Sequence, residues 1–441
     1  MNVLFISLGC DKNLVDTEYM LGLLKEHGFS MTNEESDADV IVVNTCCFIH
    51  DAKQESIETI LEMAEYKKQG RLQALIATGC LAERYKEEIL KEIPEVDAIV
   101  GTTGYESIVE AIEQALEQKK SVYCKELSYL PQPEVNRVNT TGGFFSYLKI
   151  AEGCDKYCTY CVIPSIRGKY RSVPMERLLK EATFLAEGGT KELILIAQET
   201  TVYGMDLYGK KMLPELLHKL CQIEGLEWIR VLYCYPEEIT EELIQTIKEE
   251  PKICNYLDLP IQHASDDILK RMGRRTNKKE LMKLIRTLRK EIPGIALRTS
   301  LITGFPGETE EQHTELVEFV KKMRFERLGV FTYSKEENTP AAKMKGQVTK
   351  KVKVARQKEL MLAQQEIAFE KAQKMIGKRL MVMIEGRLPE DNVYIARTYM
   401  DTPNIDGYLF LNATDMYQSG DFVKARITGA KGYDLIGEVI K

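Results

Sequence analysis

The stretch AEGCDKYCTYC, residues 151–161, carries the strongest signal in this chain. It contains three cysteines, Cys154, Cys158 and Cys161, in the spacing CxxxCxxC. A structural zinc ion takes four protein ligands, and an iron–sulfur cube has four irons to hold. The fourth ligand must therefore come from elsewhere in the chain, or one corner of the metal group is left open for chemistry.

Three other cysteines each follow an apolar run that is typical of a buried strand. Cys10 comes just after NVLFIS, Cys46 directly after DVIVVNT and Cys80 directly after ALIATG. In a parallel sheet the carboxyl ends of the strands lie along one edge, so these cysteines are expected to meet there. Ordinary core cysteines would more often lie inside the runs. We therefore predict a second metal site formed by this trio.

Zinc is the alternative metal for both trios. Zinc sites built only from protein side chains usually pair CxxC motifs with nearby cysteine or histidine. The chain has only five histidines, and none lies at such a spacing. A cube held by three thiolates, in contrast, keeps one iron open for a substrate or cofactor. The sequence favours two open iron–sulfur sites.

Length and composition indicate a globular protein of two or three domains. The chain has 441 residues, of which 44% are hydrophobic and 29% charged. Its start has no basic leader pattern, and no apolar run approaches the roughly 20 residues of a membrane helix. We therefore expect a cytoplasmic protein without a membrane partner, in which clustered cysteines bind metal. A net charge of -7 argues against nonspecific coating of nucleic acid.

The fold class predicted from the hydrophobic patterns is a multidomain α/β protein. Residues 1–125 alternate apolar strands with helices, which indicates a parallel sheet covered on both faces. In the helix expected near ESIETILEMAEY, the residues Ile57, Ile60, Leu61 and Ala64 share one face that should be buried. Residues 126–140 are expected to form a linker.

Residues 141–372 repeat the alternation with six strand patterns, which favours a partial (β/α)6 barrel over a closed eight-stranded one. The strands are expected at YLKIAE, ELILIAQE, WIRVLYCY, YLDLP, IALRTSLITGF and RLGVFTYS. A long helix free of Gly and Pro follows residue 345. Residues 373–441 change to short alternating strands, which indicates a small all-β barrel.

The motif with Tyr160 before the third cysteine resembles the radical S-adenosylmethionine (SAM) enzymes. In that superfamily the open iron of a 4Fe-4S cluster binds the amino and carboxylate groups of SAM. One-electron reduction then cleaves SAM to a 5'-deoxyadenosyl radical. The resemblance implies that Cys154, Cys158 and Cys161 hold this cluster, and it also implies a six-stranded partial barrel.

The whole chain resembles the methylthiotransferases of that superfamily through SLGCDKN, NTC, TGC, GCDKYCTYC and the β-rich tail. The resemblance implies two 4Fe-4S clusters, the second held by Cys10, Cys46 and Cys80 and carrying the sulfur or methylthio group. It also implies a C-terminal TRAM domain. Chemistry at the clusters requires no side-chain acid or base. A non-catalytic iron–sulfur electron carrier is the rival of another class.

Two branches of the family differ in substrate. Three segments of the chain resemble sequences of one branch: SLGCDKNLVDTE, IAQETTVYGMDLYG and GVFTYSKEENTPAA. That branch modifies the β-carbon of an aspartate in the twelfth small-subunit ribosomal protein, free or in the ribosome. This chain has Thr17 where serine is common in that branch, and Asn338 where glycine is common. The alternative is a tRNA adenosine methylthiotransferase. Residues 373–441 contain nine basic and nine acidic residues, whereas a barrel that grips RNA should be basic. We therefore expect no tRNA partner.

Some further residues are candidates for supporting roles. The family resemblance and their positions near strand ends make Tyr160, Gln198, Gln262 and Arg298 candidate SAM contacts, although each could be structural. Asn44 could support the first cluster through a hydrogen bond. Cys47 is expected to be a small buried residue. The electron donor is expected to be a protein such as flavodoxin or ferredoxin.

Overall fold

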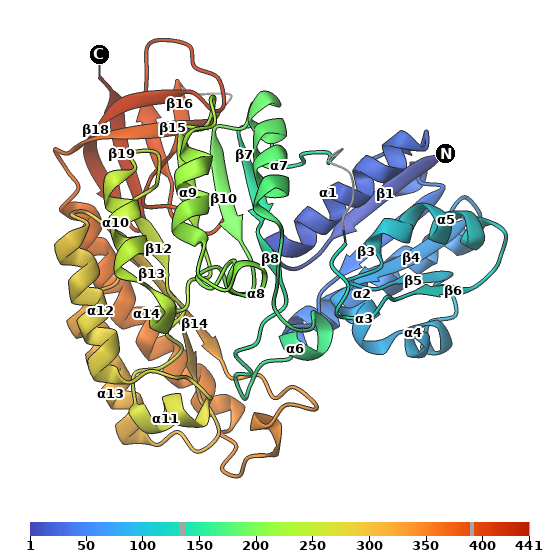
Figure 1. Ribbon diagram of the computed structural model, residues 1–441, viewed down its shortest axis with the longest axis horizontal. Coiled ribbons are helices and arrows are strands. Elements are labelled where there is room, and N and C mark those ends of the chain that lie inside the picture. Colours follow the sequence, from blue (N-terminus) through green and yellow to red (C-terminus); the bar gives the residue numbers. More distant parts are fainter. Residues whose placement is uncertain (132–136, 389–391, 441) are drawn as a thin grey trace.

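The computed structural model describes residues 1–131, 137–388 and 392–440. Figure 1 shows three parts in chain order: an N-terminal sheet domain, a central partial barrel and a small C-terminal barrel. Within the described ranges, no helix has both the length and the apolar character needed to cross a membrane. The predicted fold class is confirmed for all three parts.

The N-terminal domain is a parallel sheet with the order β2-β1-β3-β4-β5-β6 in the described part of the chain. Its strands are β1 (Asn2–Ser7), β2 (Ser30–Met31), β3 (Val40–Thr45), β4 (Ala74–Gly79), β5 (Ala98–Val100) and β6 (Ser121–Tyr123). Four of them match the predicted apolar runs. The short strands β2 and β6 lie at the two edges and were not predicted.

Helices cover both faces of this sheet, because the side chains of a strand alternate between its faces. Val40 and Val42 of β3 pack on one side with helix residues such as Val15, and Ile41 and Val43 pack on the other with residues such as Ile60. The helical segments are α1 (Asp11–Glu26), η1 (Glu35–Asp37), α2 (His50–Lys68), α3 (Cys80–Tyr85), α4 (Glu87–Glu92), η2 (Tyr105–Ser107) and α5 (Ile108–Leu116).

The buried face of α2 differs from the prediction. Ile60 and Ala64 are buried as expected, but Ile57 and Leu61 are 37% and 47% exposed. Ser56 is fully buried instead, because its hydroxyl donates to the carbonyl of Cys46 at 2.8 Å and accepts from the amide of Cys46 at 2.9 Å. The polar contact with the cysteine loop thus sets the rotation of the helix.

The central domain contains two three-stranded parallel sheets among the described residues, in the orders β7-β10-β11 and β12-β13-β14. A bridge between Ile229 and Ile253 continues one sheet toward the other. The strands are β7 (Phe145–Lys149), β10 (Glu192–Ile196), β11 (Trp228–Val231), β12 (Tyr256–Asp258), β13 (Ala296–Thr303) and β14 (Arg327–Thr332). Each of the six predicted strands is present, and together they form the partial barrel.

Helices surround the outside of this barrel. A short antiparallel pair of strands, β8 (Ala151–Glu152) and β9 (Arg171–Ser172), stands before and after the segment that contains the CxxxCxxC motif. The helical segments are α6 (Ile163–Ile166), α7 (Met175–Glu187), α8 (Met205–Tyr208), α9 (Leu213–Cys221), η3 (Pro236–Glu238), α10 (Glu241–Glu249), α11 (Asp266–Arg271), α12 (Lys278–Glu291), α13 (Glu310–Met323), η4 (Ala341–Lys343) and α14 (Lys350–Gln373). Helix α14 confirms the predicted long helix.

The C-terminal domain is a closed barrel with the strand order β15-β16-β17-β19-β18 in the residues that the structure describes. Its strands are β15 (Arg379–Arg387), β16 (Val393–Thr398), β17 (Leu409–Asn412), β18 (Phe422–Lys431) and β19 (Asp434–Val439). It packs against the amino ends of the central strands. Arg397 pairs with Glu192, the first residue of β10, at 2.5 Å, and Phe422 lies edge-on against Trp228, the first residue of β11.

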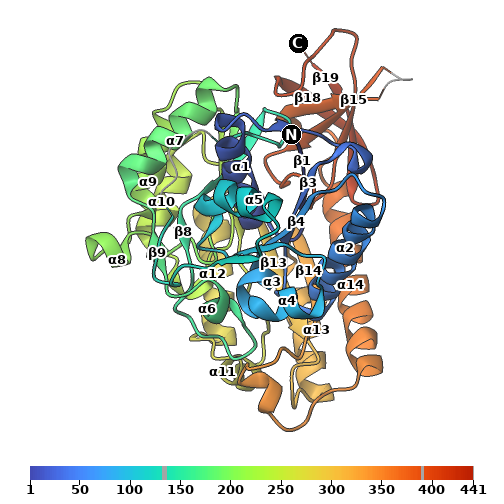
Figure 2. The ribbon, with the colours of Figure 1, turned by 90° about the vertical axis from the view of Figure 1, so that its right-hand side faces the viewer.

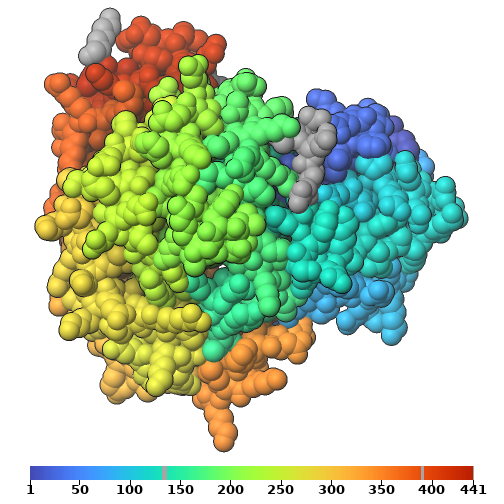
Figure 3. Space-filling view, viewed as in Figure 1, coloured from blue at the N-terminus to red at the C-terminus, as the bar shows by residue number. Residues whose placement is uncertain are grey.

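The N-terminal domain lies against the side of the partial barrel (Figures 2 and 3). Helix α1 contacts edge strand β7, and the Nζ atom of Lys12 lies 3.2 Å from the ring centroid of Tyr233. Tyr233 also donates a hydrogen bond to Asp11 at 3.1 Å. The helix that begins directly after Cys10 therefore packs on the central domain.

Candidate metal centres

The first cysteine trio lies at the carboxyl ends of three neighbouring strands, as the sequence predicts. Cys10 follows β1 at the start of α1, Cys46 follows β3, and Cys80 begins α3 directly after β4. Cys46 and Cys80 are buried and Cys10 is half-buried. Burial raises the pKa of the Cys80 thiol well above its ordinary value, and the nearby thiols of Cys10 and Cys46 raise it further.

Glycines allow the loops of this trio to approach one another closely. Gly9 has φ of +90°, and a Cβ atom there would lie 2.8 Å from the Cβ of Cys46. Gly79 has φ of +89°, and a Cβ atom there would lie 2.6 Å from the carbonyl oxygen of Thr45. A larger residue at either position would push the cysteine loops apart.

An asparagine that the sequence analysis did not single out ties these loops together. Asn13 donates hydrogen bonds from its Nδ2 atom to the carbonyls of Leu8 at 3.1 Å and Thr45 at 2.9 Å, while its Oδ1 atom lies 3.7 Å from the sulfur of Cys80. Asn44, the predicted support, instead donates to the carbonyl of Asn13 at 2.8 Å. Asn44 therefore acts on the trio through α1.

The second trio lies in the loop between β8 and α6. The thiol sulfurs of Cys154 and Cys161 accept hydrogen bonds from the backbone amides of Lys156 and Ile163. Burial raises the pKa of Cys154 to about 11 and that of Cys161 to about 12. Metal binding has to displace these protons, because the thiolate is the ligand form.

The donor sets suit iron–sulfur cubes better than single ions. All eleven cysteines are free thiols, and they lie within the described ranges. In those ranges, no group of three or more His, Cys, Asp or Glu side chains converges closely enough to hold one metal ion. A cube bonds each thiolate to a different iron, so its ligands need not converge on one point. Amides that donate to thiol sulfurs are also typical of cluster sites.

The predicted SAM contacts fall into two groups. Gln198 lies beyond the carboxyl end of β10, where its Nε2 atom donates to Glu152 at 3.2 Å and its buried Oε1 atom has no hydrogen-bond partner among the described residues. Gln262 adopts φ of +70°, and its backbone amide donates a hydrogen bond to the backbone carbonyl of Ser300 in β13 at 2.9 Å. Gln198 therefore lies beside Glu152, which precedes the cysteine loop, and a SAM contact for either glutamine stays a prediction.

The other two candidates differ in their surroundings. Tyr160 packs in the loop against a small apolar cluster with Met272 and Phe305. Arg298 lies near the amino end of β13, where it pairs with Asp258 at 2.8 Å and with Asp406 of the C-terminal barrel at 3.8 Å. Its guanidinium is thus held on the side of the barrel that faces the C-terminal domain. A SAM contact for either residue stays a prediction.

A carboxylate that the sequence analysis missed lies beside the second trio. Glu199 is fully buried, and its Oε2 atom is 3.6 Å from the Nζ atom of Lys156 in the cysteine loop. That oxygen has no hydrogen-bond partner in the described part of the chain. Burial raises the pKa of Glu199 to about 7. A buried carboxylate with an unused acceptor is suited to a cationic amino group such as that of SAM.

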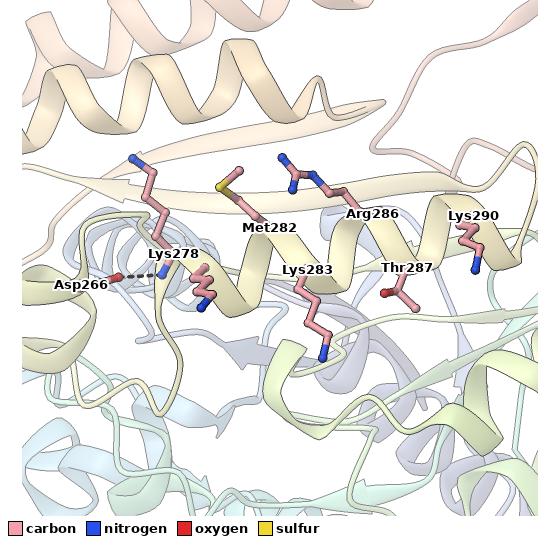
Figure 4. A pocket seen from close by; sticks show the side chains of 8 residues that line it. Asp266, Lys278, Met282, Lys283, Arg286, Thr287 and Lys290 are labelled. Atoms are coloured by element: carbon pink, nitrogen blue, oxygen red, sulfur yellow. Dashed lines mark hydrogen bonds between the residues drawn. The ribbon is translucent and has the colours of Figure 1, made fainter.

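Two of the hollows that the described residues form bear on where a substrate could enter. One, of about 480 Å³, is bounded by Asp11 beside Cys10, Tyr147 of β7 and the C-terminal residues Glu385 and Ile405. The other, of about 610 Å³, lies along the outer surface of α12, where Figure 4 shows basic side chains spread along the helix. Of these two hollows, the first adjoins a cysteine trio through Asp11, which follows Cys10 directly.

Comparisons with known proteins agree with this geometry. Residues 148–320 match the model of the radical SAM superfamily, residues 376–440 match the TRAM domain, and residues 2–101 match the family described as uncharacterized protein family UPF0004. The SAM methyltransferase TsrM from Kitasatospora setae shares the fold, with a TM-score of 0.56 at 14% identity over 77% of this chain and 76% of that chain. The fold and the cysteine loop thus define a radical SAM enzyme.

Closer relatives narrow the class to one family. The ribosomal protein uS12 methylthiotransferase RimO of Lachnoclostridium phytofermentans is 71% identical over 99% of both chains. The protein of the same name from Clostridioides difficile is 50% identical over 98% of both chains. The chain belongs to the RimO family of radical SAM methylthiotransferases.

Proposed function

We propose that this enzyme transfers a methylthio group to the β-carbon of an aspartate in ribosomal protein uS12, free or within the small ribosomal subunit. The relatives named for this activity match the chain over its whole length. The observation that carries the proposal is that two trios of thiols lie on facing parts of two domains. Arg167, which follows the second trio by six residues, reaches the sulfur of Cys80 in the first trio at 3.5 Å.

The two trios have different roles in this proposal. Cys154, Cys158 and Cys161 bind the 4Fe-4S cluster that is characteristic of radical SAM enzymes. Cys10, Cys46 and Cys80 bind a second 4Fe-4S cluster. When bound, the cluster on Cys154, Cys158 and Cys161 would supply the electron that cleaves SAM. The cluster on Cys10, Cys46 and Cys80 would supply the sulfur that is transferred. A small electron-transfer protein such as flavodoxin or ferredoxin supplies the electron.

The side chains around the second trio orient SAM. Glu199 accepts a hydrogen bond from the amino group of SAM through its unused Oε2 atom. Tyr160, in the same loop as the cysteines, packs against the adenine, and Gln198 and Gln262 bind polar atoms of the cofactor. Arg298 is not included among these contacts, because its ion pairs with Asp258 and Asp406 hold its guanidinium on the side of the barrel that faces the C-terminal domain.

Charge and shape favour a protein substrate over tRNA. The C-terminal barrel has balanced charge, whereas binding to RNA phosphates calls for a basic surface. The hollow between the three domains has acidic residues Asp11 and Glu385 on its walls. An extended segment of a basic ribosomal protein suits those walls. We therefore place the substrate segment in this hollow, with the target carbon near Cys10.

The test is an anaerobic assay of the reconstituted enzyme with a reductant, SAM and either uS12, small ribosomal subunits or tRNA. Mass spectrometry should detect a methylthio increment on an aspartate of uS12 and none on tRNA nucleosides. A full-length variant with Cys10, Cys46 and Cys80 replaced by alanine is the control and should give no increment. An increment on tRNA alone would assign the enzyme to the adenosine branch, and no release of 5'-deoxyadenosine would favour an electron carrier.

A further inference from the structure

Arg167 contacts residues of two domains, and only 1% of its surface is exposed. Its Nη2 atom lies 3.5 Å from the sulfur of Cys80 and 2.5 Å from the Oδ1 atom of Asn13, both in the N-terminal domain. Its Nη1 atom donates at 2.8 Å to Asp16 of the N-terminal domain and at 2.8 Å to Glu152 of the central domain. One guanidinium therefore occupies the interface between the two domains.

The surrounding charges balance without Cys80. Arg167 and Lys149 are the buried cations, and Asp16 and Glu152 are the buried carboxylates that they contact. The guanidinium stays protonated at any physiological pH. When Cys80 is a thiolate ligand, its negative charge is added directly beside Arg167. Arg167 thus places a fixed positive charge and a hydrogen-bond donor directly beside that sulfur.

The same segment also supports the second trio. The backbone amide of Cys154 donates to the carbonyl of Gly168 at 3.1 Å, and Gly168 follows Arg167 directly. Gly168 has φ of +73°, and a Cβ atom there would lie 2.5 Å from the carbonyl oxygen of Leu127. The backbone of residues 167–168 is therefore fixed beside one trio, while the Arg167 side chain reaches the other.

We propose that Arg167 is a positioning residue that the central domain supplies to the N-terminal metal centre. It donates a hydrogen bond to the Cys80 thiolate, stabilises the reduced state of the cluster held there, and fixes the spacing between the two trios. This inference rests on the proposed function, because it requires a cluster on Cys10, Cys46 and Cys80. Hydrogen bonds and net charge around the sulfurs are established determinants of cluster potential.

A purely structural role makes a different prediction. If Arg167 only holds the domains together, then removing its partner Asp16 should disturb the metal centre in the same way as removing Arg167. If Arg167 acts on the thiolate, the two changes have opposite signs. Loss of the positive charge disfavours the reduced cluster, whereas loss of the nearby Asp16 carboxylate favours it.

The experiment uses the full-length protein with Cys154, Cys158 and Cys161 replaced by alanine, so that only the N-terminal cluster is loaded. Iron content is measured first, and the reduction potential is then followed by electron paramagnetic resonance. Arg167→Gln should lower the reduced-to-oxidised ratio at a fixed potential at least tenfold, which is about 59 mV for one electron. Arg167→Lys keeps the positive charge but loses the planar set of guanidinium donors, so it should shift the potential less than Arg167→Gln does. Asp16→Asn should shift it upward.

Three results would overturn the inference in distinguishable ways. If Arg167→Gln retains iron and has the parent potential, Arg167 does not act on the sulfur. If Arg167→Gln and Asp16→Asn both lower the potential equally, the role is structural. If the parent variant with an intact Arg167 binds no cluster, then the second cluster of the proposed function fails, and the role of Arg167 fails with it.

Discussion

The hydroxyl oxygen of Tyr235 lies 2.6 Å from the sulfur of Cys158, the middle cysteine of the CxxxCxxC loop. Burial raises the pKa of Tyr235 far above its ordinary value, so the hydroxyl keeps its proton and is the donor when Cys158 is a thiolate. The ring is held in place by the guanidinium of Arg274, which lies 3.8 Å from the ring centroid. The second trio therefore has its own fixed donor, as the first has Arg167.

Tyr235→Phe should lower the reduction potential of the central cluster while leaving its iron content unchanged. The phenyl ring preserves the packing with Arg274, but the thiolate loses a hydrogen bond that favours the reduced state. The measurement is a redox titration in the full-length variant with Cys10, Cys46 and Cys80 replaced by alanine. Tyr399→Phe is the matched control, because the Tyr399 hydroxyl bonds the carbonyl of Gly294 instead. An unchanged potential in Tyr235→Phe would contradict the role.

The two cysteine trios should differ in what their loss abolishes. Cys158→Ala should stop cleavage of SAM, whereas Cys10→Ala should leave cleavage intact and stop methylthio transfer, because the proposed function places SAM cleavage at the second trio. Release of 5'-deoxyadenosine and modification of uS12 are measured in parallel. Cys221→Ala, in helix α9, should alter neither. Loss of both activities in a folded Cys10→Ala protein would refute this division.

The placement of the first cysteine trio could be predicted because it follows from strand direction. Cys10, Cys46 and Cys80 lie at one edge since the strands before them are parallel neighbours, and a parallel sheet places the ends of such strands on one edge. The six central strands and the C-terminal barrel were likewise evident from hydrophobic period. These features depend on short-range patterns that the sequence displays directly.

Contacts between distant segments could not be predicted in the same way. Arg167 is buried at a domain interface, and no local spacing in the sequence indicates that position. The predicted buried face of α2 was wrong because the Ser56 hydroxyl forms hydrogen bonds with the backbone of Cys46. These bonds turn the helix away from the orientation that the spacing of its apolar residues predicts. A motif that pairs a polar residue with a strand end, such as Gln198 followed by Glu199, was the available signal for the missed carboxylate.

Glu199→Gln should weaken SAM binding by roughly tenfold to a hundredfold, since a hydrogen bond to a charged group contributes about 1.5–3 kcal/mol. The amide keeps the size of the side chain but loses the charge that attracts the amino group. Binding is measured by calorimetry on the reconstituted enzyme. Glu238→Gln is the matched control, because Glu238 also pairs with Lys156 but is partly exposed. Equal weakening in both variants would assign the effect to Lys156.

His263 should make the stability of the cluster-free protein fall below pH 6.5. Burial lowers its pKa to about 3, and its Nδ1 atom accepts a hydrogen bond from the amide of Ser265 at 3.0 Å. Arg356 and His313 lower the pKa further, while the Glu308 carboxylate, 4.0 Å away, is already paired with Arg356. The folded pKa lies below the unfolded value of 6.5, so the unfolded chain takes up the proton first.

Each pH unit between 6.5 and 3 should therefore cost about 1.4 kcal/mol from this residue alone. Chemical denaturation of the wild-type protein and His263→Asn across pH 5–8 measures the difference. The variant should have lower stability at pH 8 and a smaller loss on acidification. Parallel curves for the two proteins would show that the pKa of His263 is the same in the folded and unfolded chains.

Ile405→Arg tests whether the hollow between the three domains admits the protein substrate. Ile405 is 48% exposed and lines this hollow together with Asp11. An arginine there fills the entry and places a positive charge against the basic segment that we expect to bind. The KM for uS12 should rise at least tenfold, while cleavage of SAM without substrate should be unchanged because the cysteine loop is untouched.

The matched control is Ile376→Arg, which adds the same side chain at an isoleucine that is 44% exposed but lies outside the hollow. Its KM for uS12 should equal that of the wild-type enzyme. If both variants raise KM equally, general positive charge on the C-terminal domain repels the substrate. If neither does, the substrate reaches the metal centres by another face, because a side chain as long as arginine at Ile405 obstructs this one.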